Sequence, residues 1–457
     1  MDYLLEEMEG DTLTPVAIFH RLQGKKKFLL ESSNKHEKSG RYSFIGCDPY
    51  MEIKSMGPHT EIISNNQVET LHENIIETVK KQLNPNIYAP PLPFFSGAVG
   101  FIGYDVIRQY EEIGETPEDD LKMPDSHLLF YEKVVVMDHL LQKIYIIISN
   151  FSQRKTEKEM KQEMERVKSE LVTPAKEEFQ REWVQTGKFH SHIEKGHFLD
   201  MVQQAKAHIE KGDIFQIVLS QRLEASFSGN PFSFYRELRK TSPSPYMFYI
   251  DFEDYLVLGA SPESLIKVQG NEVMTNPIAG TRKRGAKEEE DVQLEQELLH
   301  DEKELAEHRM LVDLARNDLG KVSEYGSIHL SKYMEVERFK SVMHLVSEVK
   351  GTLREDVDSL DVLSAILPAG TVSGAPKIRA MQIINNLESL KRGVYAGAVG
   401  YINQNGDLDF GLAIRTMVIK GNQAFVQAGA GIVLDSVPEK EWEETLNKAA
   451  TLLEVKR

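Results

Sequence analysis

Two pairs of glutamates, each pair three residues apart, are the strongest chemical feature of the sequence. Glu304 and Glu307 lie in LLHDEKELAEHRM, and Glu441 and Glu444 lie in DSVPEKEWEETLNKA. Residues i and i+3 share one face of a helix, with Cβ atoms about 5–6 Å apart. Each pair alone is typical of a solvated helix face, but two such faces brought together would repel unless a cation lay between them. Mg2+ fits, because it prefers oxygen ligands and shares its coordination shell with anionic substrates.

Four other segments carry further candidate site residues, three of them suited to binding an anion. Arg415 interrupts the apolar run GLAIRTM, and a buried arginine needs an anionic partner such as a substrate carboxylate. Thr371 lies in PAGTVSGAPK, a glycine-rich turn before a helix whose N–H groups can bind anions. Gly429 and Gly431 in QAGAGIV can bring backbone N–H groups against a carboxylate. His344 in SVMHLVSEV, taken alone, is more typical of a buried structural histidine.

The elements that must position these residues form a mixed pattern of strands and helices. Residues from about 13 to 150 have the pattern of strands and short helices, and a charge-rich stretch follows that predicts an exposed helix broken near Pro174. From residue 197, strands alternate irregularly with long helices at roughly 287–316 and 358–366. We therefore predict an α/β (α+β) fold with large mixed or antiparallel sheets flanked by helices. The predicted regions are 1–152, a charged helical linker at 153–190, and a catalytic region at 191–457.

The composition narrows the class of function. The formal net charge of -17 argues against nucleic acid or an anionic membrane as the main partner. The single cysteine, Cys47, permits no disulfide within the chain, which fits a reducing cytoplasm. The N-terminus lacks the apolar region of a signal peptide, and the apolar runs are too short to span a bilayer. We therefore expect a cytoplasmic globular protein with no membrane partner.

Several segments together resemble the motifs of the chorismate-using enzymes, in the order of that family. They are NPIAGTRKRG, DEKELAEHRMLVDLARND, VMHLVSEVKG, PAGTVSGAPKIRAM, AIRT and QAGAGIVLDSVPEKEWEETLNKA. The family comprises anthranilate, aminodeoxychorismate, isochorismate and salicylate synthases. The resemblance covers nearly the whole chain. It implies a β-sheet sandwich flanked by helices, chorismate as substrate, and Mg2+ as cofactor.

The resemblance also assigns roles to individual residues. Glu307 and Glu444 would bind Mg2+ directly, with Glu304 and Glu441 nearby and acting through water, and the metal would hold the ring carboxylate of chorismate. Glu263 in GASPES would be the general acid for the departing 4-hydroxyl, which requires a raised pKa. The other implied residues are Arg415, Tyr395, Gly429, Ala430 and Gly431 for the enolpyruvyl carboxylate, Lys448 as a further charge, and His344 and Thr371 for pyruvate elimination.

Two positions separate the chemistries within the family. Members that add water resemble one another in having a lysine base before the VVL strand, where this chain has Gln216, which cannot act as that base. Many aminodeoxychorismate synthases have a lysine where this chain has Ala279, which offers no nucleophile. Both positions favour the addition of ammonia by the large, synthase subunit of an anthranilate synthase. Aminodeoxychorismate synthase is the alternative.

The N-terminal half favours the same branch of the family. FLLESSNKHEKSGRYSFIG and SPSPYMFY resemble tryptophan-binding elements of anthranilate synthases, which implies feedback inhibition by L-tryptophan. Without the resemblance, these segments are simply core and turn residues. The implied inhibitor-binding residues are Leu30, Glu31, Ser32, Pro245, Tyr246 and Met247.

The source of nitrogen is the remaining question that the sequence addresses. Cys47 lies in RYSFIGCDPY, which lacks the context of an amidotransferase nucleophile, and no length is spare for such a domain. We therefore expect ammonia as the nitrogen source, either free or from a separate glutamine amidotransferase subunit, and hence a hetero-oligomer. A non-catalytic chorismate sensor could lose carboxylates, whereas all four are present here.

Overall fold

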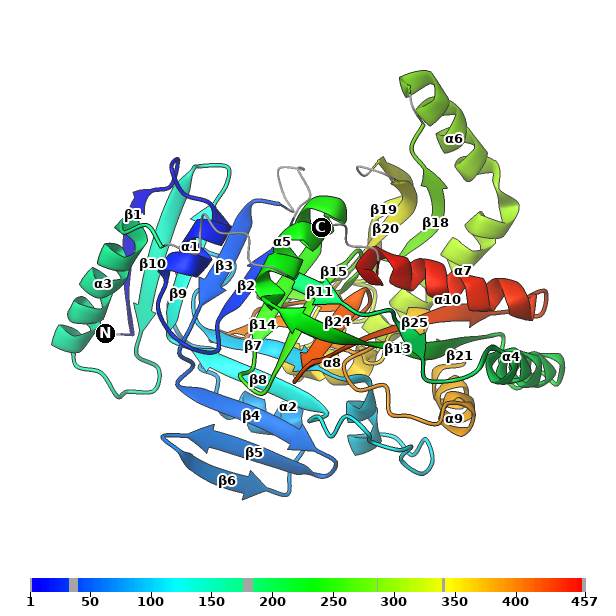
Figure 1. Ribbon diagram of the computed structural model, residues 1–457, viewed down its shortest axis with the longest axis horizontal. Coiled ribbons are helices and arrows are strands. Elements are labelled where there is room, and N and C mark those ends of the chain that lie inside the picture. Colours follow the sequence, from blue (N-terminus) through cyan, green and yellow to red (C-terminus); the bar gives the residue numbers. More distant parts are fainter. Residues whose placement is uncertain (1, 33–39, 176–183, 286, 339–341, 454–457) are drawn as a thin grey trace.

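The computed structural model describes residues 2–32, 40–175, 184–285, 287–338 and 342–453 of the 457-residue chain. In this part of the chain the strands form two large sheets, and neighbouring strands within each sheet run antiparallel. Figure 1 shows the two sheets with helices on their outer sides. The predicted fold class, large antiparallel or mixed sheets with flanking helices, is confirmed.

The first sheet has 13 strands among the described residues. Its order is β1 (Tyr3–Glu9), β10 (Lys143–Ser149), β9 (Lys133–Asp138), β3 (Tyr42–Gly46), β2 (Phe28–Glu31), β14 (Tyr246–Asp251), β15 (Tyr255–Ser261), β24 (Thr416–Lys420), β25 (Gln423–Ile432), β13 (Gln216–Gly229) and β11 (Val184–Thr186), with β12 (His190–Ser191) and β21 (Gly374–Ala375) also paired to β13.

The second sheet has 12 strands among the described residues. Its order is β18 (Ile278–Lys283), β20 (Val342–Thr352), β17 (Glu272–Thr275), β16 (Ser264–Gln269), β23 (Leu408–Leu412), β22 (Ala398–Asn403), β7 (Gly97–Ile102), β8 (Ser126–Tyr131), β4 (Met51–Met56), β5 (His59–Ser64) and β6 (Gln67–Leu71), with β19 (His329–Arg338) paired to β20.

Each sheet has one face against the other sheet and one face against helices. Phe28 and Phe248 of the first sheet pack with Phe101 and Tyr131 of the second in one buried cluster. Burying a large apolar side chain contributes about 1.5–3 kcal/mol, so this aromatic layer holds the two sheets together. The α-helices of the described residues are α1 (Pro15–Arg21), α2 (Ile75–Lys80), α3 (Glu157–Val172), α4 (Lys195–Glu210), α5 (Pro231–Thr241), α6 (Glu288–His300), α7 (Glu302–Gly320), α8 (Ser359–Ile366), α9 (Lys377–Leu387) and α10 (Pro438–Leu453), and a 3-10 turn, η3 (Gly370–Val372), precedes α9.

In both sheets a block of strands from the N-terminal region adjoins a block of strands from the rest of the chain. In the first sheet, β2 pairs with β14, which places Glu31 opposite Met247. In the second sheet, β7 pairs with β22, which places Gly100 opposite Gly400. The regions 1–152 and 191–457 therefore share both sheets and the core between them.

The charge-rich stretch after residue 152 forms a helix, as its composition predicts. Helix α3 begins with a capping box made by Thr156 and Glu159 and ends at Val172, just before Pro174. Its apolar residues Met160 and Leu171 are buried against the first sheet, while its charged residues face outward. Residues 176–183, the next part of the predicted linker, lie outside the described residues. No helix in the described residues is long and apolar enough to cross a membrane.

The long helix predicted at roughly 287–316 is divided into α6 and α7. Asp301 lies between them with an extended backbone, and its side chain accepts hydrogen bonds from the backbone N–H groups of Lys303 and Glu304. An aspartate in this position caps the N-terminus of the second helix. The prediction of helix in this stretch is confirmed, but the prediction of one uninterrupted helix is wrong, because the cap at Asp301 begins a second helix.

Candidate active site

A cavity of about 860 Å³ brings together residues that are far apart in the sequence. This volume lies in the range of about 300–1,000 Å³ that is typical of sites for small molecules. Thirteen of the predicted active-site residues line it: Gln216, Glu263, Glu304, Glu307, His344, Thr371, Tyr395, Arg415, Gly429, Gly431, Glu441, Glu444 and Lys448. Lys303, Ser436 and Lys440 also line it and were not predicted; their only signal is their position beside the glutamates.

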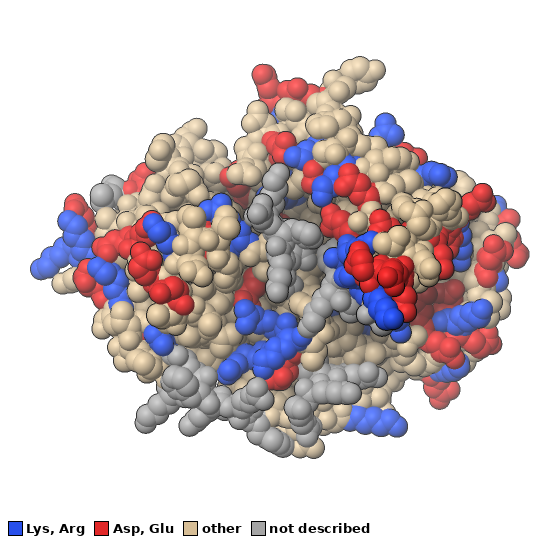
Figure 2. All heavy atoms as spheres, turned by 90° about the horizontal axis from the view of Figure 1, so that it is seen from above, with Lys and Arg blue, Asp and Glu red and all other residues tan. Residues whose placement is uncertain are grey.

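Helices α7 and α10 supply the four glutamates to this cavity. Burial raises the pKa of Glu307, and the neighbouring carboxylates Glu304 and Glu444 raise it further. Burial and Glu444 likewise raise the pKa of Glu441. Seen from above, Asp and Glu side chains are mixed with Lys and Arg on both halves of the visible surface (Figure 2). The two helices therefore interact electrostatically, as the sequence pattern predicts.

The carboxylate oxygens on these two helices are ligands of the type that a hard divalent cation prefers. Lys448 is 2.7 Å from Glu444, and Arg282 is 3.4 Å from Glu304, so two of the four carboxylates have cationic partners. Among the described residues, no three His, Cys, Asp or Glu side chains are already arranged as a metal site. Mg2+ commonly takes only one or two carboxylates and fills its shell with water and substrate oxygens. The carboxylates of Glu307 and Glu444 fit such an ion.

Glu263 and Arg415 lie on the wall of the same cavity with few partners. The hydroxyl of Thr371 donates a hydrogen bond of 2.9 Å to Oε1 of Glu263. Burial raises the pKa of Glu263 to about 7, although Thr371, Lys448 and Arg415 oppose the rise. The guanidinium of Arg415 makes no hydrogen bond or ion pair with any residue that the structure describes. A largely buried guanidinium in this state is suited to a carboxylate ligand.

His344 lies on β20, opposite Thr281 of β18. Its Nδ1 is 2.9 Å from the carbonyl oxygen of Gly280, which accepts a hydrogen bond from the ring. Burial lowers the pKa of His344, so the ring is neutral near pH 7. With the proton on Nδ1, the Nε2 atom is the basic one.

Strands β13 and β25 form the floor of the cavity, and their side chains alternate between the two faces. Val218 is opposite Gly431, and Ser220 is opposite Gly429. A Cβ atom at Gly429 would lie 2.6 Å from the hydroxyl of Tyr395, and one at Gly431 would lie 2.9 Å from Nε2 of Gln216. Glycine at these positions therefore makes room for both polar side chains and exposes backbone to a ligand.

Ala430 is the one predicted active-site residue that does not line the cavity. Its side chain is fully buried on the other face of β25, in the cluster formed with α4 and α9. Successive residues of a strand point to opposite faces, so two cavity-facing glycines turn the residue between them away.

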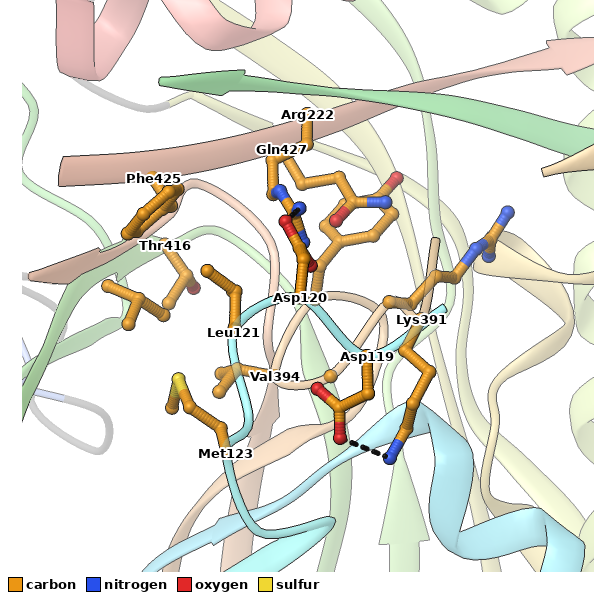
Figure 3. Close-up of a pocket in the computed structure, with 14 residues that line it drawn as sticks. Asp119, Asp120, Leu121, Met123, Arg222, Lys391, Val394, Thr416, Phe425 and Gln427 are labelled. Atoms are coloured by element: carbon orange, nitrogen blue, oxygen red, sulfur yellow. Dashed lines mark hydrogen bonds and ion pairs between the residues drawn. The ribbon is translucent and has the colours of Figure 1, made fainter. Parts of the chain in front are cut away.

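A smaller cavity of about 30 Å³ adjoins the main one and shares Tyr395 and Gln427 with it. Figure 3 shows Asp119 joined to Lys391 and Arg222 beside Asp120 on its wall. These charges are already paired with one another. The space holds only about one water molecule, so it cannot accommodate a substrate of the size that the main cavity admits.

The six predicted inhibitor residues lie where β2 meets β14, because these strands pair. Glu31 and Met247 face α5; Glu31 accepts a hydrogen bond of 2.9 Å from Tyr235 and is 2.8 Å from Arg239. The hydroxyl of Ser32 is buried without a hydrogen-bond partner among the described residues.

The other predicted inhibitor residues are placed differently. Leu30 packs in the layer between the sheets, and the hydroxyl of Tyr246 donates to Asp409 at 2.8 Å in the direction of the second sheet. Pro245 precedes β14 and is partly exposed. The alternation of side chains therefore groups Glu31 with Met247 and separates both from Leu30 and Tyr246.

Comparison with known proteins adds independent information. A model of the chorismate binding enzyme family matches residues 25–454. Anthranilate synthase component 1 of Lactococcus lactis is 45% identical over 99% of both chains, and that of Aquifex aeolicus is 47% identical over 98% of this chain and 93% of its own. A crystal structure of anthranilate synthase component I from Streptococcus pneumoniae has a TM-score of 0.86 at 45% identity, covering 97% of this chain and 98% of that one.

Proposed function

We propose that this chain, which belongs to the chorismate binding enzyme family, is the synthase component of an anthranilate synthase. It would convert chorismate and ammonia to anthranilate and pyruvate, a lyase reaction of tryptophan biosynthesis. The full-length similarity to proteins named anthranilate synthase component 1 supports this proposal. The observation that carries it is one cavity that holds a protonatable Glu263, two acidic helices, and an Arg415 whose guanidinium has no ion-pair partner among the described residues.

Chorismate carries two carboxylates, and the cavity offers a separate partner for each. Arg415 would bind the enolpyruvyl carboxylate, with the hydroxyl of Tyr395 and the backbone at Gly429 and Gly431 beside it. Mg2+, when bound by Glu307 and Glu444 with help from Glu304 and Glu441, would neutralise the ring carboxylate and orient the ring. Lys448 would add a positive charge at the same end of the cavity, where it is 2.7 Å from Glu444.

The amination step needs an acid for the leaving group. Ammonia adds to C2 of chorismate, and the bond between C4 and its hydroxyl breaks. Glu263, whose pKa of about 7 keeps much of it protonated, would give its proton to the departing hydroxyl, which leaves as water. The ammonium nitrogen formed on C2 then loses a proton, so one proton is given and one is released. The product of this step is aminodeoxyisochorismate.

The second step eliminates pyruvate and aromatises the ring. The C2 proton leaves as the bond between C3 and the enolpyruvyl oxygen breaks, and the enolpyruvyl group takes up a proton to become pyruvate. The neutral ring of His344, whose Nε2 is the basic atom, is our candidate base for the C2 proton. Thr371 lies within hydrogen-bond distance of Glu263 and would orient that carboxyl in both steps.

We propose that the nitrogen comes from a separate glutamine amidotransferase component, so that the working enzyme is a hetero-oligomer in the reducing cytoplasm. The relatives' designation as component 1 supports a second component. Burial raises the pKa of the Cys47 thiol to about 11, so this thiol is a poor nucleophile. The purified chain should therefore use ammonium but not glutamine.

We also propose that L-tryptophan inhibits the enzyme by binding between β2 and α5. The buried hydroxyl of Ser32, which has no hydrogen-bond partner in the part of the chain that the structure describes, and the adjacent Glu31 support a ligand with an amino-acid end. Met247 supports an apolar wall. This site is separate from the glutamates of α7 and α10.

The alternatives within the family predict other products. Gln216 lines the cavity in place of the lysine expected of water-adding members, and Ala279 lines it in place of the lysine of many aminodeoxychorismate synthases. The deciding experiment incubates the purified chain with chorismate, ammonium and Mg2+ and separates the products. Formation of fluorescent anthranilate supports the proposal. Accumulation of 4-aminodeoxychorismate without anthranilate would instead indicate an aminodeoxychorismate synthase.

A further inference from the structure

An ion pair buried behind the cavity wall has no role in the chemistry described so far. Glu388 follows α9, and Arg392 lies four residues later in the loop before β22; both side chains are almost completely buried. Nε of Arg392 is 2.7 Å from one carboxylate oxygen of Glu388, and Nη2 is 2.6 Å from the other. This bidentate arrangement is the strong form of an arginine–carboxylate pair.

The remaining donors of Arg392 reach two separate parts of the cavity wall. Nη1 donates to the carbonyl oxygen of Val372 at 2.7 Å, and Nη2 donates to that of Val218 at 2.7 Å. Val372 follows Thr371 in the 3-10 turn η3, and Val218 lies on β13; both residues line the cavity. One guanidinium therefore fixes the turn that carries Thr371 relative to the floor of the cavity.

A third part of the wall is Tyr395. The guanidinium lies 5.6 Å from the centre of the Tyr395 ring on one side and 4.7 Å from that of Tyr104 on another. Stacking of this kind is attractive and directional. The Tyr395 hydroxyl faces Gly429, so the position of its ring determines where the hydroxyl meets a ligand.

Glu388 extends the same network across the floor. It accepts hydrogen bonds from the backbone N–H of Ser220 at 2.8 Å and from its hydroxyl at 2.9 Å. The Ser220 hydroxyl in turn accepts a hydrogen bond from Gln427 at 2.8 Å, and Gln427 lines the cavity. Neither Glu388 nor Arg392 lines the cavity itself, so neither touches a ligand there.

We propose that the Glu388–Arg392 pair is a positioning device for the proposed chorismate site, setting Tyr395, the Thr371 turn and the β13–β25 floor relative to one another. The inference rests on the proposed function. Stability alone is a weak reason for such a pair, because replacing a buried ion pair with apolar residues is often neutral or stabilising. Positional accuracy is a stronger reason, since a displacement of about 1 Å can cost about 100-fold in rate.

The test compares three variants with wild type in the ammonium-dependent reaction. Arg392→Met leaves the carboxylate of Glu388 buried and unpaired. The double variant Glu388→Met plus Arg392→Met removes the pair with no change in net charge and no unpaired charge. Arg41→Met is the matched control for Arg392→Met, because Arg41 forms a bidentate pair with the buried Asp138 on β9 and neither residue lines the cavity. Thermal unfolding, kcat, KM for chorismate and the pH profile of kcat are measured for each.

We expect the double variant to unfold near the wild-type temperature yet to lose about 10- to 100-fold in kcat/KM for chorismate. We also expect the basic limb of its pH profile to move to higher pH. A displaced Thr371 no longer donates to Glu263, and this donor lowers the pKa of Glu263. The Arg41→Met control should leave the limb unmoved even if it lowers the unfolding temperature.

The opposite result is equally definite. A double variant with wild-type kcat/KM and an unmoved basic limb of the pH profile overturns the proposal. The Glu388–Arg392 pair would then contribute to the fold without positioning the cavity residues. If the double variant does not fold, Arg392→Lys provides the answer, since it keeps the charge but lacks the fork that reaches three partners. Wild-type kcat/KM in that variant would also overturn the proposal. Failure of the wild-type chain to form anthranilate would instead count against the proposed function.

Discussion

Two glutamates, Glu263 beside the cavity and Glu31 on β2, share one property, which is that burial raises the pKa of both carboxyls. Glu31 accepts a hydrogen bond from Tyr235 and is paired with Arg239, so its carboxylate is held in one place. Among the described residues, the carboxyl of Glu263 accepts one hydrogen bond, from Thr371, and it faces an open cavity. The comparison shows that burial alone does not make a catalytic acid; burial with few fixed partners leaves the proton available for transfer.

The largest effect should follow from removing the acid itself. Glu263→Gln should lower kcat for anthranilate formation by about 100- to 10,000-fold, the usual contribution of general acid catalysis. Glu31→Gln, the matched change at the other glutamate, should leave uninhibited turnover within about threefold of wild type. Both rates come from anthranilate fluorescence with saturating chorismate and ammonium. Equal losses in the two variants would remove the distinction between the two glutamates.

The metal-binding glutamates should have the next largest effect. Glu307→Gln and Glu444→Gln should each lower activity by at least about 100-fold, because even the outer-shell partners of a metal are worth about 10- to 100-fold. The folded state should persist, since neither side chain is part of the apolar core. The measurement is a Mg2+ titration of activity alongside circular dichroism. Near-normal turnover of either variant at limiting Mg2+ would contradict the assignment.

The pH dependence of kcat should identify Glu263 as the acid. Glu263 must be protonated to act as an acid, so kcat should fall as pH rises through about 7 when the concentration of free NH3 is held constant. At constant total ammonium this fall is masked, because the fraction present as NH3 grows with pH. Thr371→Val removes a donor that lowers the pKa of Glu263, and should therefore move the limb to higher pH. An unmoved limb would show that another group is the acid.

The smallest effect should be on tryptophan inhibition, in variants of the residues beside Glu31. Ser32→Ala should raise the inhibitory concentration of tryptophan by about 3- to 10-fold, since a typical hydrogen bond contributes about 0.5–1.5 kcal/mol. Met247→Thr should act in the same direction, with some loss of stability because Met247 is buried. Uninhibited turnover should change little. A tryptophan titration at equal chorismate gives the comparison, and insensitivity of the wild-type enzyme to millimolar tryptophan would end the regulatory proposal.

The sequence predicts which residues line the cavity better than it predicts the contacts that hold those residues in place. The four glutamates of α7 and α10 and Arg415 are recognisable from their types and local spacing, whereas Glu263 is recognisable only because GASPES resembles a family motif. Arg392 and Glu388 were not predicted, because their role depends on carbonyl groups of Val218 and Val372 that only the tertiary fold brings within reach.

The orientation of side chains on strands was the other limit. Ala430 lies between two predicted glycines, and only the pairing of β25 with β13 shows that it faces away from the cavity. The sharing of both sheets by the two ends of the chain was also beyond prediction, since strand pairing across hundreds of residues leaves no local pattern. The fold class followed from the elements, but their order in the sheets did not.

The pairing of an early strand with a late strand in each sheet has a consequence for synthesis of the protein. The partner of β7, β22, begins 296 residues after β7 ends, counted from Ile102 to Ala398. These residues must be synthesised before the two strands can pair. At about 5–20 residues per second, that edge stays unpaired for roughly 15–60 seconds. One edge of β2 likewise stays unpaired until β14 has been synthesised. The first third of the nascent chain must therefore remain free of aggregation with open sheet edges, so its production should depend on chaperones more than its final stability would indicate.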